Sequence, residues 1–428
     1  MEYVHQELEL STTQLEPFSV PNIKTTYVSY LEQKFHPNSL SGDNQLVYQI
    51  TIKSDSKRWI KLSDITLYME TSIQEKKDGL IKDFTNLGGN SLTYQTLYPY
   101  LIFDSIGIEF NDKLISQNNE YPIRSFLKTI LSYDMPNIYT NLELSSLYMG
   151  NEDDGWYDTA PLRSPAISSP SVNAVTLTAH DTKFKTLYDL FTTSNKTKRW
   201  TITPLYCDII DTYKLIPPGI TVKLTFTRNK ELSSIIHTPN PTTYAATLPD
   251  MHLNIHQIYI KVPMLELNEE INTKYKEAIK QNIPIYIPFT RNNIRVLDLD
   301  LVKTQYFYNI TSGKLPRSVI IFIYDPTRKT SRNKNTLFFE KSGIKEITLD
   351  IPGSTDATRK VEMDWTNNTW QFAYYHYLNN IGYSHNNEHN LISKSRFENG
   401  MTIFPFDLTP DRYNYYYYYY YYFNSKYY

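Results

Sequence analysis

Residues 220–228 have the sequence ITVKLTFTR, in which apolar and polar residues alternate. Successive side chains of an extended chain point to opposite faces, so one face would carry Ile220, Val222, Leu224 and Phe226. The opposite face would carry only threonine and lysine before Arg228. Such alternation predicts a strand of an antiparallel sheet with one face buried and the other solvated.

The same alternation occurs at Leu46–Ile52, Ile65–Ile73 and Ile347–Ile351. Further strands are predicted at Ile102–Phe110, Trp200–Cys207, Ile255–Val262, Arg295–Val302 and Met401–Phe406. Val319–Ile323 is continuously apolar, so we expect it to be buried on both faces or to lie in an interface. Turn-forming residues separate these runs, as at Pro217-Pro218-Gly219, which is typical of a β-sandwich or barrel.

Helices are expected at only two places. Pro122–Tyr133 has an apolar stripe and a proline suited to a first helical position. Asn268–Gln281 opens with an N-cap asparagine followed by two glutamates. We expect both helices to pack across sandwich edges rather than to bind partners. Leu142–Val172 and Thr366–Asn399 are predicted to be long polar loops.

The chain of 428 residues is long enough for two domains. Glu231–Asp250 has no convincing periodicity and three prolines, so it is predicted to be the crossing between two halves. The fold class is therefore all-β, with two tandem antiparallel jelly rolls and a few short helices. The predicted parts are an N-terminal arm at 1–40, a first jelly roll at 41–230, a linker at 231–250, a second jelly roll at 251–412, and a tyrosine-rich tail at 413–428.

Composition narrows the function classes. The 43 basic and 45 acidic residues leave no basic surplus, which argues against sequence-specific or wholesale nucleic-acid binding. One cysteine excludes an intrachain disulfide. The first residues lack the apolar core of a secretory signal, and no run approaches the ~18 apolar residues of a membrane span. We expect a soluble protein made inside the cell.

Catalytic patterns are weak. His385–His389 matches H-x-x-E-H, but asparagine and glycine surround it, so a loop is the better interpretation than a zinc helix. His252 and His256 lie on a predicted strand rather than on a helix. The same holds for Asp298 and Asp300, which would lie on a solvated face.

Two further candidates are also discounted. Glu152–Asp154 lacks the spacing of an EF-hand calcium loop, and Cys207 is interpreted as a small buried residue. We therefore predict no catalytic residue, no metal site and no cofactor, and the protein is expected not to be an enzyme.

Three stretches carry a resemblance to a known family. They are Tyr98–Gly107 with Tyr121–Leu127, then Ile202–Ile209 with Leu215–Ile220, and finally Phe404–Asp411. Together they resemble the major capsid proteins of Polinton (Maverick) elements and related eukaryotic double-stranded DNA viruses. The second stretch is similar to the end of the first jelly roll in that family, and the third to the closing strand of the second.

The resemblance implies a structural protein of the virion. Homotrimers with pseudo-hexagonal outlines would tile an icosahedral shell around double-stranded DNA, assembled inside the host cell with vertex or minor capsid proteins as partners. Three alternatives stay open: a vertex or minor capsid protein with one jelly roll, a carbohydrate-binding or cupin-like jelly-roll protein, and a domesticated host protein that no longer assembles.

Overall fold

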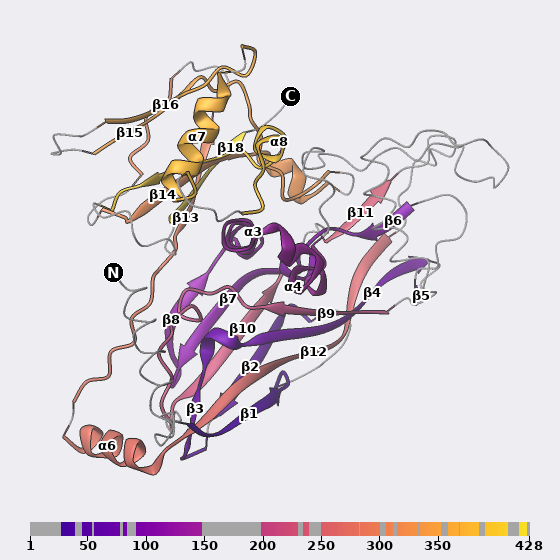
Figure 1. The fold of residues 1–428 in the computed structure, drawn as a ribbon. Coiled ribbons are helices and arrows are strands. Elements are labelled where there is room, and N and C mark those ends of the chain that lie inside the picture. The colour runs from indigo at the N-terminus through magenta and orange to yellow at the C-terminus, as the bar shows by residue number, and fades with distance from the viewer. Residues whose placement is uncertain are drawn as a thin grey trace, which may run out of the picture.

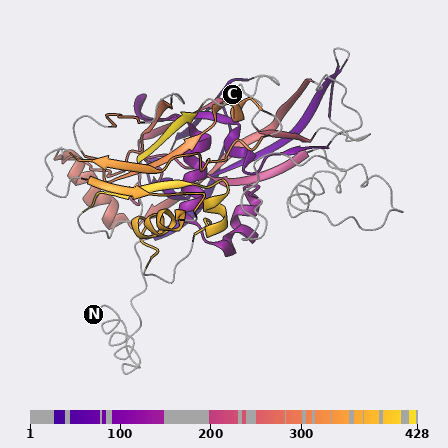
Figure 2. The same cartoon turned by 90° about the horizontal axis from the view of Figure 1, so that it is seen from above.

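The computed structural model places a β-sandwich below a second, smaller β-rich half (Figure 1). The helix α3 (Tyr121–Ser132) lies between the two halves, and a long extended segment runs along one side of the sandwich up to the second half. Viewed from above, the orange-to-yellow second half covers part of the first sandwich (Figure 2). The structure describes residues 27–38, 45–53, 55–77, 80–83, 91–147, 198–229, 234–238, 250–281, 283–299, 305–310, 315–331, 334–351, 358–367, 369–384, 390–409 and 419–425.

The lower sandwich contains two larger sheets. The first has the order β1-β12-β4, with β9 pairing β4 and short strands at its margins: β1 (Tyr27–Phe35), β12 (Asp250–Leu267), β4 (Thr66–Lys77), β9 (Lys198–Pro204), β3 (Arg58–Ile60) and β5 (Leu80–Asp83). The second has the order β2-β10-β7-β8: β2 (Val47–Lys53), β10 (Thr221–Arg228), β7 (Phe103–Phe110) and β8 (Lys113–Asn118). A two-stranded ribbon adds β6 (Ser91–Tyr94) and β11 (Ile235–Thr238).

The antiparallel pairing is nested along the chain. The first strand, β1, pairs β12, and the next, β2, pairs β10. Inside these, β4 pairs β9 and β7 pairs β8. Eight strands paired from the outside inward in two facing sheets make up a jelly roll. The apolar side chains of β10 point into the core between the sheets, and Leu224 lies opposite Ile50 of β2. The alternation of residues 220–228 is therefore confirmed as a half-buried strand.

Strand pairing moves two predicted boundaries. β1 lies within the predicted N-terminal arm at 1–40, yet it is the edge strand of the first sheet. β12 occupies the beginning of the second jelly roll as predicted, from residue 251 onward. It pairs, however, with β4, β1 and β3 of the first sandwich. The first sandwich therefore extends from Tyr27 to Leu267. Local patterns give the existence of a strand, but its partner depends on contacts far away in sequence.

The second half is built on the sheet β13-β18-β14-β17 and the hairpin β15-β16: β13 (Ile294–Leu299), β18 (Tyr419–Ser425), β14 (Ser318–Tyr324), β17 (Ile403–Asp407), β15 (Glu346–Asp350) and β16 (Thr358–Glu362). β14 is buried at every residue, as its apolar run predicted. The predicted tyrosine-rich tail supplies β18, which runs parallel to both β13 and β14.

Short helices fill the margins: α2 (Tyr98–Leu101), α3 (Tyr121–Ser132), α4 (Asn141–Leu144), α6 (Glu269–Lys280), α7 (Trp370–Asn380) and α8 (Lys394–Glu398), with 3-10 turns η1 (Leu62–Asp64), η2 (Met135–Tyr139) and η5 (Pro326–Lys329). The two predicted helices are confirmed as α3 and α6, and the Asn268 side chain caps α6 by accepting from the Glu270 N–H. The predicted loop at 366–399 is wrong in part, because it contains α7 and α8. Trp370, Ala373 and Tyr377 form the buried stripe of α7, which the surrounding asparagines disguise in the sequence.

Together these elements confirm an all-β fold of mostly antiparallel sheets with a few short helices. α3 packs in the interior, as expected of a helix across a sandwich edge. α6 differs from that expectation because none of its residues is buried.

α7 is fixed to β17 by a buried histidine. The ring Nε2 of His376 lies 2.8 Å from the Pro405 carbonyl oxygen, and its Nδ1 lies 3.2 Å from the Asn380 amide nitrogen. A neutral ring with its proton on Nε2 donates to Pro405 and accepts from Asn380, so both contacts are satisfied. Burial lowers the pKa of His376 to about 4.

Replacing Leu224 with alanine tests the core of the first sandwich. Leu224 is fully buried, so Leu224→Ala should lower the free energy of unfolding by ~2–5 kcal/mol through lost burial and a cavity. Val47→Ala, on the exposed side of the neighbouring strand, is the matched control and should change it by less than ~1 kcal/mol. Denaturant titration measures both, and equal effects would contradict this position of the core.

His376 predicts a pH dependence of stability. The pKa of His376 in the folded protein is about 4, below the ordinary value of about 6.5, so between these pH values the unfolded chain binds a proton that the folded chain does not. Stability should therefore fall as pH drops from about 6.5 to about 4, by up to ~3 kcal/mol from this group. Urea unfolding of the wild type and of His376→Gln at several pH values between about 4 and about 6.5 measures the difference in their free energies of unfolding. If both proteins lose stability equally over this range, His376 is not the group responsible.

Candidate functional site at the seam between the two halves

The α3 helix lies where the two halves meet (Figure 1). Ten of its twelve residues are buried, because it has a β-sandwich on one side and the second half on the other. The Phe126 ring packs 5.4 Å from the Phe339 ring of the second half. The backbone carbonyl of Ile130 accepts a hydrogen bond from the Leu391 N–H. We call this boundary the seam.

A buried ion pair anchors the seam. Arg124 of α3 donates from Nη1 to Asp208 Oδ1 at 2.7 Å, and the two side chains are only 5% and 2% exposed. Arg124 also donates from Nη2 to the Asn292 carbonyl at 2.6 Å. The Asn292 N–H donates back to Asp208 Oδ1 at 3.1 Å, and the Ser116 hydroxyl donates to Oδ2 at 3.2 Å. Both members of the ion pair therefore bind the backbone of one residue, Asn292, in the segment leading into β13.

Burial raises the pKa of the Asp208 carboxyl, and Arg124 together with the Asn292 N–H opposes that rise. Arginine stays protonated in proteins, so the buried guanidinium needs a carboxylate beside it. The ion pair is thus a constraint on packing: neither member can remain buried without the other.

Other polar contacts cross the seam beside this pair. Lys329 Nζ lies 2.7 Å from Glu120 Oε2 at the start of α3. The Gln95 amide donates to Asn335 Oδ1 at 2.7 Å, and the Thr336 hydroxyl donates to Gln95 Oε1 at 3.3 Å. Each contact joins a first-sandwich residue to the turn region that follows β14.

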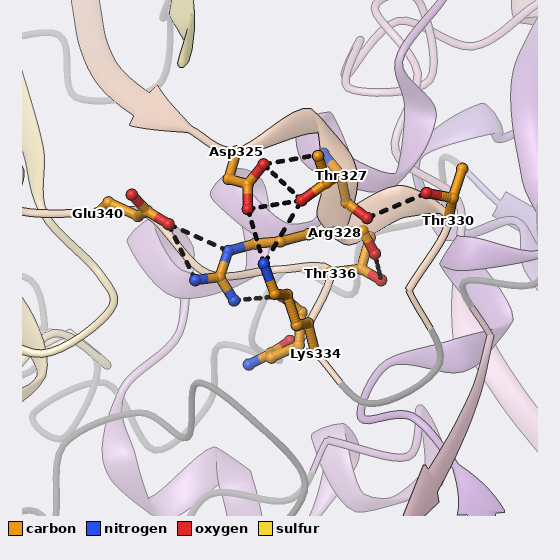
Figure 3. A network of polar contacts seen from close by, with 8 residues as sticks. Asp325, Thr327, Arg328, Thr330, Lys334, Thr336 and Glu340 are labelled. Atoms are coloured by element: carbon orange, nitrogen blue, oxygen red, sulfur yellow. Dashed lines mark hydrogen bonds and ion pairs between the residues drawn. The ribbon is translucent and has the colours of Figure 1, made fainter. Parts of the chain in front are cut away.

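That turn region is shaped by a network of its own (Figure 3). Asp325 caps η5 by accepting from the Thr327 N–H at 2.9 Å and the Thr327 hydroxyl at 2.7 Å. Lys334 Nζ lies 3.1 Å from Asp325 Oδ2, and Arg328 Nη2 lies 2.9 Å from Glu340 Oε1. Burial would raise the pKa of Asp325, but the Thr327 and Lys334 contacts outweigh it and hold that pKa below its ordinary value. The network presents Lys329 to the first sandwich.

The seam offers no activated nucleophile. Burial, with the neighbouring Asp208 carboxylate, raises the pKa of the Cys207 thiol, which keeps it protonated. Burial likewise raises the pKa of the hydroxyls of Tyr100, Tyr121 and Tyr206 well above the ordinary value. Within the described ranges, no group of three His, Cys, Asp or Glu residues is placed to hold a metal ion. The contacts at the seam are suited to holding the two halves of the protein in one orientation.

Most of the residues considered as candidate sites in the sequence fall outside the part of the chain that the structure describes. His385–His389, Glu152–Asp154 and Asp300 lie outside the described residues, as does the side chain of His252. His256 contacts the Ser72 hydroxyl at 2.8 Å on β4. Cys207 is buried, as predicted. Among the described helices, none is long and apolar enough to cross a membrane.

The sequence patterns did not identify Arg124 and Asp208 as a pair, although both residues lie in stretches that carry the family resemblance. Arg124 lies in the stretch Tyr121–Leu127, and Asp208 lies in Ile202–Ile209. The available signal was a charged residue inside an otherwise apolar run in each stretch. Nothing local indicates that these two charges, 84 positions apart, face each other.

Comparison with known proteins supports the fold. No family model matches the chain. An uncharacterized protein of Caenorhabditis elegans is 25% identical over 161 residues, which covers 37% of this chain and 38% of the worm protein. The chain thus matches well under half the length of that relative.

Solved structures of a virophage particle and of viral major capsid proteins align with this chain. The cryo-EM structure of the Sputnik virophage aligns over 92% of this chain and 79% of that chain, with 9% identity and a TM-score of 0.51. The mavirus major capsid protein aligns over 59% of this chain and 50% of its own, with 13% identity and a TM-score of 0.30. The Faustovirus major capsid protein aligns over 62% and 60%, with 12% identity and a TM-score of 0.31. The Sputnik alignment, which spans both halves, shows the predicted double jelly-roll fold.

The seam pair makes a stability prediction. Asp208→Asn keeps the side-chain shape but leaves Arg124 buried without its countercharge, so the free energy of unfolding should fall by ~3–5 kcal/mol. The double variant Arg124→Met/Asp208→Leu should recover part of that loss, because it removes both buried charges.

The control is Lys274→Ala, which removes an exposed ion pair with Glu270 on α6 and should leave stability unchanged. Chemical denaturation measures all three variants. A stable Asp208→Asn protein would refute the role assigned to the pair.

Proposed function

We propose that this protein is the major capsid protein of a double-stranded DNA virus or a Polinton (Maverick)-type element. It would form homotrimers that tile an icosahedral shell, with vertex or minor capsid proteins as partners and the virion as its location. Its role would be structural and not enzymatic. The observation that carries the proposal is the double jelly-roll likeness to the Sputnik particle over 92% of the chain.

The buried contacts at the seam support this proposal, because they fix the orientation of one half against the other. Lattice assembly needs a building block whose contact surfaces keep a fixed geometry, because every copy must make the same contacts. Two sandwiches joined by a loose linker would not meet that need. Here buried contacts of α3 with Asn292 and Phe339 hold the second half against the first.

The presence of two sandwiches in each chain supports a trimer. Two related sandwiches in each of three chains give six similar corners, an outline that packs in a hexagonal lattice. A closed ring of three requires heterologous contacts, in which one surface of a copy meets a different surface of the next. Contacts of this obligate kind bury more than ~2,000 Å².

The rival classes make different demands. A vertex or minor capsid protein with one jelly roll would leave the second sheet, β13-β18-β14-β17, without a purpose. A carbohydrate-binding or cupin-like protein would present a cluster of metal ligands or an open aromatic cleft on its strands. The aromatic pair on the outer face of the first sheet, Tyr68 and Tyr259, is stacked on itself at 4.9 Å rather than open.

Oligomeric state tests the proposal. The purified chain of 50.3 kDa should elute as a trimer of about 151 kDa in size-exclusion chromatography with light scattering. Negative-stain electron microscopy should then show pseudo-hexagonal particles or closed shells. Monomers alone at micromolar concentration would count against a capsid role, and a pentamer would favour the vertex alternative.

A further inference from the structure

α6 and the segment after it project from the body of the protein (Figure 1). No residue of α6 is buried, and its contacts with the sandwich centre on Trp59, which donates to Asn272 Oδ1 at 2.9 Å and packs on Tyr275. A helix of twelve residues gains most of its stability from packing. Because α6 has no buried residue, we expect it to pack on a surface outside its own sandwich.

The segment Ile283–Ile287, which we call the arm, continues this projection. It exposes Ile283, Ile285 and Tyr286, the last with 79% of its surface in contact with solvent. All ten residues from Gln281 to Thr290 are uncharged. Uncharged, aromatic-containing surfaces of this kind are typical of the centre of protein interfaces.

The arm also has backbone groups available for pairing. Pro284 and Pro288 have no N–H, and the Pro288 carbonyl accepts from the Thr212 hydroxyl at 3.0 Å. Alternate residues of an extended chain direct their backbone groups to opposite edges. The N–H groups of Ile285 and Ile287 therefore lie on the edge away from Thr212. In the described part of the chain, they have no hydrogen-bond partner.

The second surface is the outer edge of β1, which we call the free edge. Among the described strands, only β12 pairs with β1. On the other side of β12, the Pro263 carbonyl accepts a hydrogen bond from the Lys61 N–H at 3.0 Å. Glu32 lies opposite Pro263, and Tyr30 lies opposite Leu265. By the same alternation, Tyr30 and Glu32 direct their N–H and C=O groups away from β12. Tyr30 is 57% exposed, and its neighbours Val28 and Leu31 are also exposed.

The arm and the free edge lie on opposite sides of one strand. Leu265 of β12 pairs with Trp59 of β3 on one side and with Tyr30 of β1 on the other. α6 packs on Trp59, so the arm leaves from the β3 side. Within one copy the arm and the free edge face different directions, and they meet only between copies arranged head to tail.

The two surfaces also match in polarity and in register. Residues 27–31 of β1 are uncharged, like the arm. In an antiparallel pair, two residues that face each other direct their backbone groups either both toward the partner strand or both away from it. If the arm pairs antiparallel to β1, Ile285 therefore lies opposite Tyr30, with Ile283 opposite Glu32 and Ile287 opposite Val28. In this register the free N–H and C=O groups of both strands face each other.

We propose that the arm of one copy adds as a strand to the free edge of β1 in the next copy. This inference rests on the proposed function, because it identifies the contact that would close the trimer. Main-chain hydrogen bonds to Tyr30 and Glu32 hold the added strand, and Ile285 or Tyr286 cover the exposed side chains of β1. The contact is heterologous, as a three-membered ring requires.

Tyr30→Pro is the decisive variant. It removes an N–H that points to the free edge, without removing a hydrogen bond to β12, and edge strands tolerate proline at such positions. Tyr30→Ala is the matched control, since it also removes the tyrosine ring but keeps the N–H. Tyr30→Pro should weaken trimer formation at least ~10-fold more than Tyr30→Ala, because the contact occurs at every junction of the ring. Circular dichroism and unfolding curves confirm that both variants fold.

A mixing experiment tests the head-to-tail arrangement. Ile285→Asp/Tyr286→Asp disables the arm and leaves β1 intact, whereas Tyr30→Pro disables β1 and leaves the arm intact. Each variant alone should be monomeric at concentrations where the wild type is trimeric. An equal mixture should form heterodimers and no larger species, because one functional junction remains for each pair. Sedimentation velocity distinguishes these species.

The outcomes separate this contact from the function on which it rests. A trimeric wild type with equally trimeric variants overturns the arm contact and leaves the capsid proposal standing. A mixture that stays monomeric also overturns the pairing of arm with β1. A wild type that is monomeric throughout overturns both proposals.

Discussion

The ion pair between Arg124 and Asp208, together with its hydrogen bonds to the backbone N–H and C=O of Asn292, is the interaction on which the rest of the structure depends. Burying either charge alone would cost several kcal/mol. The two therefore have to be buried together, and they can be satisfied only when the segment before β13 lies against them. This requirement turns two sandwiches in sequence into one body with a defined angle between its halves.

The two ends of the first sandwich differ: the end at the seam is tightly packed, whereas the other end has exposed elements. At the seam, ten of the twelve residues of α3 are buried, and the turn after β14 is held by Asp325 and Arg328. At the far end, α6 has no buried residue, and β1 pairs with no described strand other than β12. A body that fixes its internal geometry and leaves complementary backbone edges open is suited to assembly.

Several strands were predictable because each of them carries a local sequence pattern. The alternation of residues 220–228 gives β10, and the continuous apolar run gives β14. α7 was missed because its buried stripe of Trp370, Ala373 and Tyr377 is interrupted by helix-poor residues, whereas packing on the second sheet stabilises it. The domain boundary was misplaced at β12 because no local pattern states which strand another will pair with.

Taken by itself, the sequence determined many of the strand positions, the helices α3 and α6, and the all-β class, since these depend on residues near one another in the chain. Only the tertiary structure decided that β12 closes the first sandwich, that Arg124 meets Asp208, and that the arm and the outer edge of β1 have no partner among the described strands. Those features depend on contacts between distant residues, and the free energy of such contacts arises only when the folded chain removes them from water.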